Sequence, residues 1–251
     1  MLTVTAVSRS FGGVYALREV SLAVAEGEVC GVIGPNGAGK STLFNLVTGH
    51  LTADGGEISF LGRRVERLAP HRRALLGMAI VFQGARVFRG MTVRENVMVG
   101  AHGHTRAGFV AAALRLPRHH RAERDIAREA EAALDRVGLA EWADRPADLL
   151  PIGQQRALQL ARALCARPRL LLLDEPASGL RGAEREQLAA LVEELRADGL
   201  TILLIEHDVA FVTRLAGRVV VLDLGQVIAD GSPAEVRADP LVRAAYLGQA
   251  S

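Results

Sequence analysis

The chain has 251 residues, of which 49% are hydrophobic and 4% aromatic, and its formal net charge is +2. This length suits one large α/β domain or two small ones, and the balanced charge by itself indicates neither a nucleic-acid partner nor a membrane surface. No apolar run approaches the roughly 18–20 residues that cross a bilayer, and the first residues lack the pattern of a secretion signal.

Two short strands are predicted at the start, Leu2–Val7 and Val20–Val24, around a turn at Gly12-Gly13. Phe11 stands just before this turn. From the residues alone, two interpretations of Phe11 stay open: its ring packs in the core, or it lies against a flat base. A third strand, Val29–Ile33, leads into the most informative stretch of the chain.

That stretch is GPNGAGKST, from Gly34 to Thr42, and a helix-like segment follows it. A strand, a glycine-rich turn and a helix together form the context of a P-loop, which binds a nucleoside triphosphate. The glycines allow successive backbone N–H groups to surround an anion, and a side chain at Gly37 or Gly39 is expected to intrude there. The helix adds the positive end of its dipole.

Two side chains of this loop have distinct expected roles. Lys40 is expected to meet the β- and γ-phosphates, and Ser41 to hold Mg²⁺. Lys40 is also the only lysine in the chain, which indicates that a compact point charge is needed at this position. The residues predicted to bind the nucleotide here are Gly34, Asn36, Gly37, Ala38, Gly39, Lys40, Ser41 and Thr42.

After the loop, the pattern predicts a helix at Leu43–Val47, a strand at Glu57–Leu61, a short basic helix at Pro70–Leu76 and a strand at Met78–Phe82. The last of these strands ends at Gln83. A neutral amide at the carboxyl end of a strand, beside a phosphate site, is able to bind Mg²⁺ or to orient a water.

From Gly84 to about Arg167 the chain is predicted to consist of helices and loops. A basic patch at Arg115–His120 has no interleaved aromatic residues and is followed by acids, so we interpret it as a solvated surface rather than a nucleic-acid site. Glu123–Val137 carries an apolar stripe at helical spacing and is predicted to be an amphipathic helix. A further helix is predicted to begin within Pro151–Gln155.

The C-terminal part alternates buried strands with helices, which predicts a mostly parallel sheet covered on both faces. The predicted elements are a strand at Leu170–Leu173, a helix at Ala183–Ala197, strands at Thr201–Ile205, Arg218–Leu222 and Gln226–Ala229, and a helical tail at Pro233–Tyr246. Gln83, Asp174 and His207 all follow strand ends, where open α/β sheets bind their ligands.

Three of the residues at these strand ends suit phosphate chemistry. Asp174 is expected to hold Mg²⁺, because a hard cation prefers carboxylate oxygen. Glu175 is expected to act as the general base on the water that attacks the γ-phosphate. His207 is expected to hydrogen-bond the γ-phosphate or to position that water.

The order and spacing of these motifs resemble the ABC-transporter ATPase family over essentially the whole chain. The motifs are Gly34 to Thr42, Gln83, Gly153-Gln154-Gln155, the run LLLLDEP and His207. The closest resemblance is to the ATP-binding subunits of branched-chain amino-acid uptake systems (the LivG type). It is carried by FGGVYAL, VFRGMTVRENVMVGAH, LLIEHD, GSPAEVRADPLVRAAYLG and a long insertion at Ala101–Arg124.

The resemblance implies an α/β P-loop NTPase fold with a mostly parallel core sheet, an N-terminal antiparallel β region and an inserted helical subdomain. Residues 1–85 and 168–251 would form the nucleotide-binding core, and residues 86–167 the helical subdomain. It implies that Phe11 stacks on adenine, that Gln83 links the nucleotide to a membrane subunit, and that His207 is the switch histidine.

The resemblance also implies that two such subunits close on two ATP molecules. Gly153 and Gln154 would then touch the γ-phosphate bound by the opposite subunit. A helix beginning near Gly153 offers free N–H groups to an anion, which fits such a contact. Two residues depart from the family pattern: Pro151 replaces the usual signature serine and offers no N–H, and Arg181 stands where many members carry aspartate.

The function implied is ATP hydrolysis that drives a separate permease, with ATP and Mg²⁺ as cofactors and a location on the cytoplasmic face of the inner membrane. The partners implied are permease subunits, a second identical or sister ATPase subunit and, indirectly, an extracytoplasmic binding protein; no nucleic acid is expected. Branched-chain amino acids are the expected cargo. The alternatives are uptake of urea or short amides, lipopolysaccharide export, and a non-transport ABC ATPase of DNA repair or translation.

Overall fold

The computed structural model describes residues 1–84, 86–101 and 117–247, with side chains described for 1–84, 86–101 and 123–246. The basic patch predicted at Arg115–His120, and most of the Ala101–Arg124 insertion, lie outside the described side chains. The chain forms two compact units. Unit 1 comprises Met1–Ile80 and Leu170–Ser251, and unit 2 comprises Val81–Arg169.

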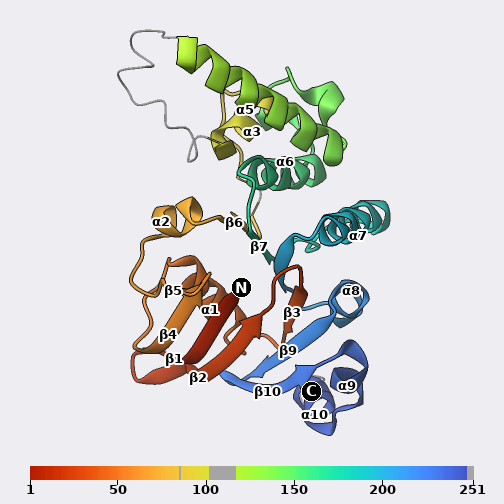
Figure 1. Cartoon of the computed structure of the whole chain (residues 1–251). Coiled ribbons are helices and arrows are strands. Elements are labelled where there is room, and N and C mark those ends of the chain that lie inside the picture. The colour runs from red at the N-terminus through yellow and green to blue at the C-terminus, as the bar shows by residue number, and fades with distance from the viewer. Residues whose placement is uncertain (85, 102–116, 248–251) are drawn as a thin grey trace. The chain divides into compact units, whose positions relative to one another are not determined.

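An antiparallel sheet forms the N-terminal part of unit 1, as predicted (Figure 1). Its strands, in spatial order, are β2 (Val14–Val24), β1 (Leu2–Phe11), β4 (Gly55–Phe60) and β5 (Arg63–Arg64). Alternate side chains such as Leu2 and Val4 are buried, which is the pattern of a sheet with one covered face. The strands β1 and β2 extend to the turn at Gly12-Gly13, so both are longer than predicted.

The second sheet of unit 1 is mostly parallel, which confirms the predicted fold class. Its strands, in spatial order, are β10 (Gln226–Gly231), β9 (Arg218–Asp223), β3 (Val29–Ile33), β8 (Thr201–Ile205), β7 (Leu170–Asp174) and β6 (Met78–Val81). The central strand β3 pairs in parallel with β8 and β9, and β8 pairs in parallel with β7. The edge strand β10 runs antiparallel to β9. All residues of β3 and β8 are buried, as expected for strands covered on both faces.

The helices of unit 1 follow the predicted strands and loops (Figure 1). They are α1 (Lys40–Thr48), α2 (Pro70–Leu75), α7 (Gly182–Ala197), α8 (Val209–Leu215), α9 (Pro233–Ala238) and α10 (Pro240–Leu247). The tail predicted at Pro233–Tyr246 is helical, as predicted, but it consists of two helices, α9 and α10. The chain is extended at Asp239, because the proline that follows disfavours helical backbone before it and lacks an N–H.

The C-terminal end of α1 is held by a buried arginine. Arg73, on α2, is 1% exposed. It donates to the carbonyl oxygens of Leu46 (2.6 Å), Val47 (2.7 Å), Leu68 (2.9 Å) and Glu66 (3.1 Å). Burial lowers the pKa of the Arg73 guanidinium to about 10. Its donors satisfy carbonyl groups that a helix end otherwise leaves without partners.

Unit 2 is helical within its described residues. Its helices are α3 (Val93–Ala101), α5 (Pro117–Arg136) and α6 (Ile152–Cys165). Two 3₁₀ turns, Ala140–Trp142 and Ala147–Leu149, lie between α5 and α6. The predicted stripe of α5 is buried at Ile126, Ala130 and Leu134 and packs on Leu158 of α6 in one apolar core. The helix α3 was not predicted from the sequence.

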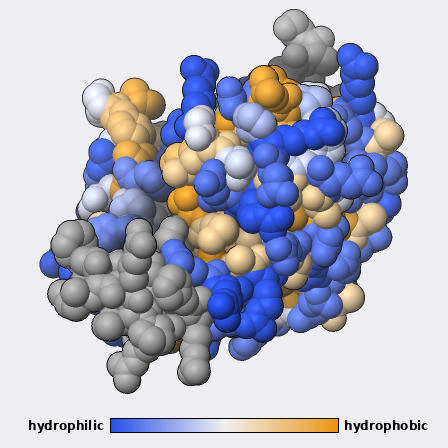
Figure 2. All heavy atoms as spheres, turned by 90° about the horizontal axis from the view of Figure 1, so that it is seen from above, coloured by the Kyte–Doolittle hydropathy of each residue, from blue (hydrophilic) through white to orange (hydrophobic). Residues whose placement is uncertain are grey.

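Within the described residues, no helix combines the length and the apolar character needed to cross a membrane. On the face shown in Figure 2, hydrophobic residues lie in small groups among hydrophilic ones.

Candidate functional site

The glycine-rich loop connects the end of β3 to the start of α1, as predicted. A Cβ atom at Gly34 would lie 2.1 Å from the Leu222 carbonyl oxygen, and one at Gly39 would lie 2.5 Å from the Ala16 carbonyl oxygen. Both glycines are therefore required by close packing against the backbone beside the loop. At Gly37 a Cβ would meet no protein atom within 4 Å, and the φ angle of +82° is what favours glycine there. The predicted intrusion of a side chain at Gly37 on a bound anion stays a prediction.

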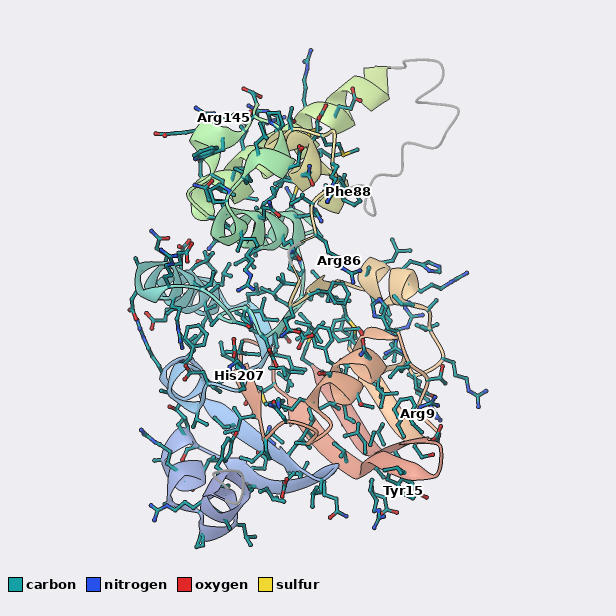
Figure 3. All side chains as sticks on the ribbon, turned by 180° about the vertical axis from the view of Figure 1, so that it is seen from behind. Arg9, Tyr15, Arg86, Phe88, Arg145 and His207 are labelled. Carbon is teal, nitrogen blue, oxygen red and sulfur yellow. The ribbon has the colours of Figure 1, made fainter. Side chains whose placement is uncertain are left out.

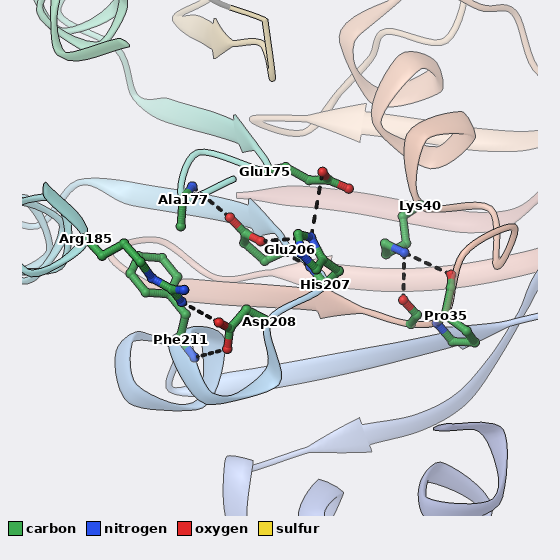
Figure 4. Close-up of polar contacts among 10 residues, drawn as sticks. Pro35, Lys40, Glu175, Ala177, Arg185, Glu206, His207, Asp208 and Phe211 are labelled. Carbon is green, nitrogen blue, oxygen red and sulfur yellow. Dashed lines mark hydrogen bonds and ion pairs between the residues drawn. The ribbon is translucent and has the colours of Figure 1, made fainter. Parts of the chain in front are cut away.

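Lys40 is the first residue of α1, and its side chain folds back over the loop (Figure 4). Its Nζ atom donates to the carbonyl oxygens of Gly34 (2.6 Å) and Pro35 (3.0 Å). Lys40 is 6% exposed, and burial lowers the pKa of its ammonium group. The charges of Glu175, Asp174 and Glu206 oppose this shift, so the cation faces a group of carboxylates.

The start of α1 is suited to an anion. The helix begins after Gly39, which has left-handed backbone, and no side chain caps its first turn. Uncapped N–H groups and the positive end of the helix dipole attract phosphate. Ser41 and Asn36 are exposed beside this helix start, whereas Ala38 is buried.

On the acidic side of the site, Asp174 ends β7. Burial raises the pKa of Asp174 to about 6, and the neighbouring carboxylates of Glu175 and Glu206 add to this rise, while Lys40 opposes it. Such a surplus of negative charge fits a divalent cation. The part of the chain that the structure describes holds no group of three or more histidines, cysteines or acids arranged around a metal. Mg²⁺ typically takes one or two protein ligands and completes its shell with water and phosphate, so Asp174 and Ser41 fit it.

Glu175 has a φ angle of +45°, an uncommon conformation for a residue with a side chain. Its N–H donates to the Ile205 carbonyl oxygen at 2.8 Å, which extends the pairing of β7 with β8 by one residue. Backbone strain of this kind concentrates at functional sites. The Oε2 atom of Glu175 lies 3.7 Å from Nδ1 of His207, and so the structure brings together the residues predicted to be the base and the switch histidine.

His207 follows the end of β8, and its side chain is 54% exposed (Figures 3 and 4). Beyond Glu175, its Nδ1 atom lies 3.5 Å from Oε2 of Glu206. Glu206 is fully buried and accepts hydrogen bonds from the N–H groups of Ala177 (2.8 Å) and His207 (3.2 Å). Burial raises the pKa of the Glu206 carboxyl, and the two hydrogen bonds oppose that rise.

The sequence interpretation missed two residues here. The sequence interpretation assigned no role to Glu206, although an acid that directly follows an apolar strand indicates a candidate site residue. Asp208 stands just before α8, and its carboxylate caps the helix by accepting from the N–H of Phe211 (2.9 Å). Asp208 also pairs with Arg185 of α7. The hydrogen bond from Arg185 is the main reason that the pKa of Asp208 is lowered.

Phe11 ends β1 and is 46% exposed, so the structure excludes the interpretation of this ring as a core residue. The guanidinium carbon of Arg9 lies 4.8 Å from the centre of the ring. Arg9 is itself held by the Asp54 carboxylate at 2.7 Å. Arg9 and the nearby Tyr15 are labelled in Figure 3. A half-exposed ring with a cation against it is suited to stacking on a base.

Gln83, Gly153 and Gln154 belong to unit 2 and are described within it. Gln83 is exposed and follows β6. Gly153 and Gln154 lie in the first turn of α6, which follows Pro151 and has no side-chain cap. The uncapped start of this 14-residue helix is where the sequence interpretation expected it.

A family model described as "ABC transporter" matches residues 17–178, and one described as "Branched-chain amino acid ATP-binding cassette transporter" matches residues 226–251. The chain is 42% identical over 251 residues to the high-affinity branched-chain amino acid transport ATP-binding protein BraF of Pseudomonas aeruginosa, and 40% identical to LivG of Escherichia coli. Each alignment covers 100% of this chain and 98% of the relative. A nucleotide-free ATP-binding cassette from an ABC transporter matches with a TM-score of 0.85 and 31% identity, over 99% of both chains.

Proposed function

The chain belongs to the ATP-binding protein family of ABC transporters, and from that premise we propose that it drives the import of branched-chain amino acids through a separate permease. Members of this family hydrolyse ATP, and this chain is such an ATPase. The observation that carries the cargo proposal is the identity of 42% over the full length to a branched-chain amino acid transport protein, together with the C-terminal family model. Neither favours the urea, export or non-transport alternatives.

For nucleotide binding, we assign the triphosphate to the loop Gly34–Thr42. The uncapped N–H groups of α1 would hold the phosphate oxygens. Lys40 would exchange its bonds to the Gly34 and Pro35 carbonyl oxygens for bonds to the β- and γ-phosphates. The exposed ring of Phe11 would stack on adenine.

For the metal, the hydroxyl of Ser41 and the carboxylate of Asp174 are the proposed ligands in unit 1. The role of Gln83 toward the metal stays a prediction from the sequence. Mg²⁺, when bound, would neutralise charge on the phosphates. The raised pKa of Asp174 supports this assignment, because a carboxylate held among other acids gains most from a cation.

For hydrolysis, Glu175 would accept a proton from the water that attacks the γ-phosphate. His207, at 3.7 Å from Glu175, would position that water or donate to the γ-phosphate. In the proposed step, a proton of the water moves to the Glu175 carboxylate as the water oxygen bonds to the γ-phosphorus. The bond from the γ-phosphorus to the β–γ bridging oxygen breaks, and that oxygen leaves with ADP.

For assembly, we infer a pair of subunits in which Gly153 and Gln154 of one subunit contact the nucleotide of the other. The start of α6 has no side-chain cap, which supports an anion contact supplied by a partner. Pro151 offers no N–H to such a contact, so the contact would depend on the N–H groups of the following residues. A permease, a binding protein outside the cell, and a position on the cytoplasmic side of the membrane complete the proposal.

The test is ATPase activity of the full chain, alone and co-purified with the permease, with transport of leucine into vesicles as the second readout. We expect Lys40→Ala to abolish nucleotide binding or turnover. We expect Glu175→Gln to bind ATP but to hydrolyse it about 100-fold or more slowly, and the exposed Glu26→Gln to match the wild type. Undiminished turnover in Glu175→Gln would remove Glu175 from its role, and an active ATPase that drives no leucine uptake would refute the cargo.

A further inference from the structure

We propose that Glu206 is a positioning residue of the hydrolysis site, which sets the spacing between Glu175 and His207 through its buried carboxylate. The inference rests on the proposed roles of these two residues. It adds a third group to them, one that is fully buried and acts by holding the segments that carry these two residues.

The contacts of Glu206 link two segments that are distant in the sequence (Figure 4). One carboxylate oxygen, Oε1, accepts from the N–H of Ala177 at 2.8 Å, in the loop that follows Glu175. The other, Oε2, accepts from the N–H of His207 at 3.2 Å and lies 3.5 Å from its Nδ1 atom. The same side chain therefore holds the loop of the base with one oxygen and the histidine with the other.

These contacts begin where the sheet ends. The last paired residues of β7 and β8 are Asp174 and Ile205. The N–H of Glu175 still donates to the Ile205 carbonyl oxygen at 2.8 Å, and the backbone pairing of β7 with β8 ends at this bond. The Glu206 side chain replaces the missing backbone pairing by reaching Ala177. The strained φ angle of +45° at Glu175 is thus held on both sides, by Ile205 before it and by Glu206 after it.

The burial of Glu206 is unfavourable for stability alone. The residue is 0% exposed, and the nearby charges include the acids Glu175 and Asp174 as well as the cation Lys40. A buried ionic group of this kind can often be replaced by an apolar residue with no loss of stability, or with a gain. A carboxylate at this position is explained by what it holds, which is one N–H donor at each of its two oxygens. An apolar side chain accepts neither bond, and a neutral amide has an acceptor oxygen at only one of the two places.

The test compares Glu206→Gln with the wild type in the full chain. Glutamine has the same length but replaces one acceptor oxygen by an amino group, so one of the two N–H bonds is lost. We expect kcat for ATP hydrolysis to fall by about 10- to 100-fold, the range for misplaced catalytic groups, while the Kd for nucleotide stays within about threefold. The matched control is Thr201→Val, at the other end of β8. It removes a buried hydroxyl that accepts a hydrogen bond from the Gly27 N–H, and it should leave kcat unchanged.

A double-mutant cycle separates positioning from general damage. If Glu206 acts by setting the spacing between Glu175 and His207, then Glu206→Gln should change kcat by less than about twofold in a His207→Ala background, because that spacing has no effect once the imidazole is gone. Losses that multiply in the double variant would overturn the inference, as would wild-type kcat in Glu206→Gln. If Glu206→Gln does not fold, Glu206→Asp keeps the charge and withdraws the carboxylate by one methylene, and the same cycle applies to it. An inactive wild-type chain would refute the proposed function instead.

Discussion

Replacing Arg73 tests whether a buried cation holds the helix that carries Lys40. The Arg73 guanidinium donates to four carbonyl oxygens, and two of them, those of Leu46 and Val47 at the end of α1, are reached by fully buried bonds. In Arg73→Met the side chain keeps an apolar stem of similar length and loses every donor. The two buried carbonyl groups then have no partner from this position and no access to water.

The magnitude follows from those two groups. Leaving a buried acceptor without a hydrogen bond costs about 1–3 kcal/mol, and this applies in full to the Val47 carbonyl group. The Leu46 carbonyl oxygen keeps the hydrogen bond that it accepts from the Gly49 N–H at 3.3 Å. Its loss is therefore that of one buried hydrogen bond, about 0.5–1.5 kcal/mol. The hydrogen bonds from Arg73 to the carbonyl groups of Leu68 and Glu66 are only partly buried, so water can replace Arg73 there at little cost in free energy. Relief from burying the cation offsets part of the loss. We therefore expect the free energy of unfolding to fall by about 1–3 kcal/mol, a sizeable share of the roughly 5–15 kcal/mol typical of a domain.

The assay is denaturant unfolding followed by circular dichroism, with Arg72→Met as the matched control. Arg72 is the neighbouring arginine on α2, and it is exposed. We expect Arg72→Met to stay within about 0.5 kcal/mol of the wild type. Equal stabilities of the two variants would refute the argument, because they would mean that the carbonyl groups at the end of α1 do not depend on Arg73.

Three further predictions use other features of unit 1. Lys40 is the only lysine and is 6% exposed, so an amine-reactive reagent should modify it slowly, and bound ATP should slow the reaction further. Peptide mass spectrometry measures the labelling, and equal labelling with and without ATP would contradict the Lys40 assignment. Phe11→Ala should weaken ATP binding by roughly 3- to 10-fold in a fluorescence titration, with Tyr15→Ala as the control, and equal effects of the two would contradict stacking on Phe11. The pKa of Asp208 is lowered by Arg185, so their pairing stabilises the fold fully above the ordinary pKa of 3.8 and less as the pH falls through the lowered folded value. The stability difference between the wild type and Arg185→Met should therefore be constant from pH 7 to pH 5 and shrink below about pH 4 in denaturant titrations; a difference that grows on acidification would contradict this sign.

Much of unit 1 could be predicted from local sequence because its signals are local. The strands β3, β7 and β8 are apolar runs bounded by turns or acids, and their predicted limits agree with the structure to within one residue. The loop from Gly34 to Thr42 is recognised by residues that are adjacent in the chain. A strand that ends in a polar residue also predicts where that residue lies, since parallel strands bring their carboxyl ends to one edge of the sheet.

What the sequence determined, therefore, is the set of local elements and the chemistry at their ends: the phosphate loop, the acids after β7 and the histidine after β8. The tertiary structure decided which of these ends meet, and with what. The pairing of Glu206 with Ala177, and of Arg73 with the end of α1, joins residues that no local pattern relates. The hydrogen-bond partners of these buried polar atoms come from other segments of the chain. Which atoms are shielded from water, and so require a partner within the protein, is decided only when the chain folds.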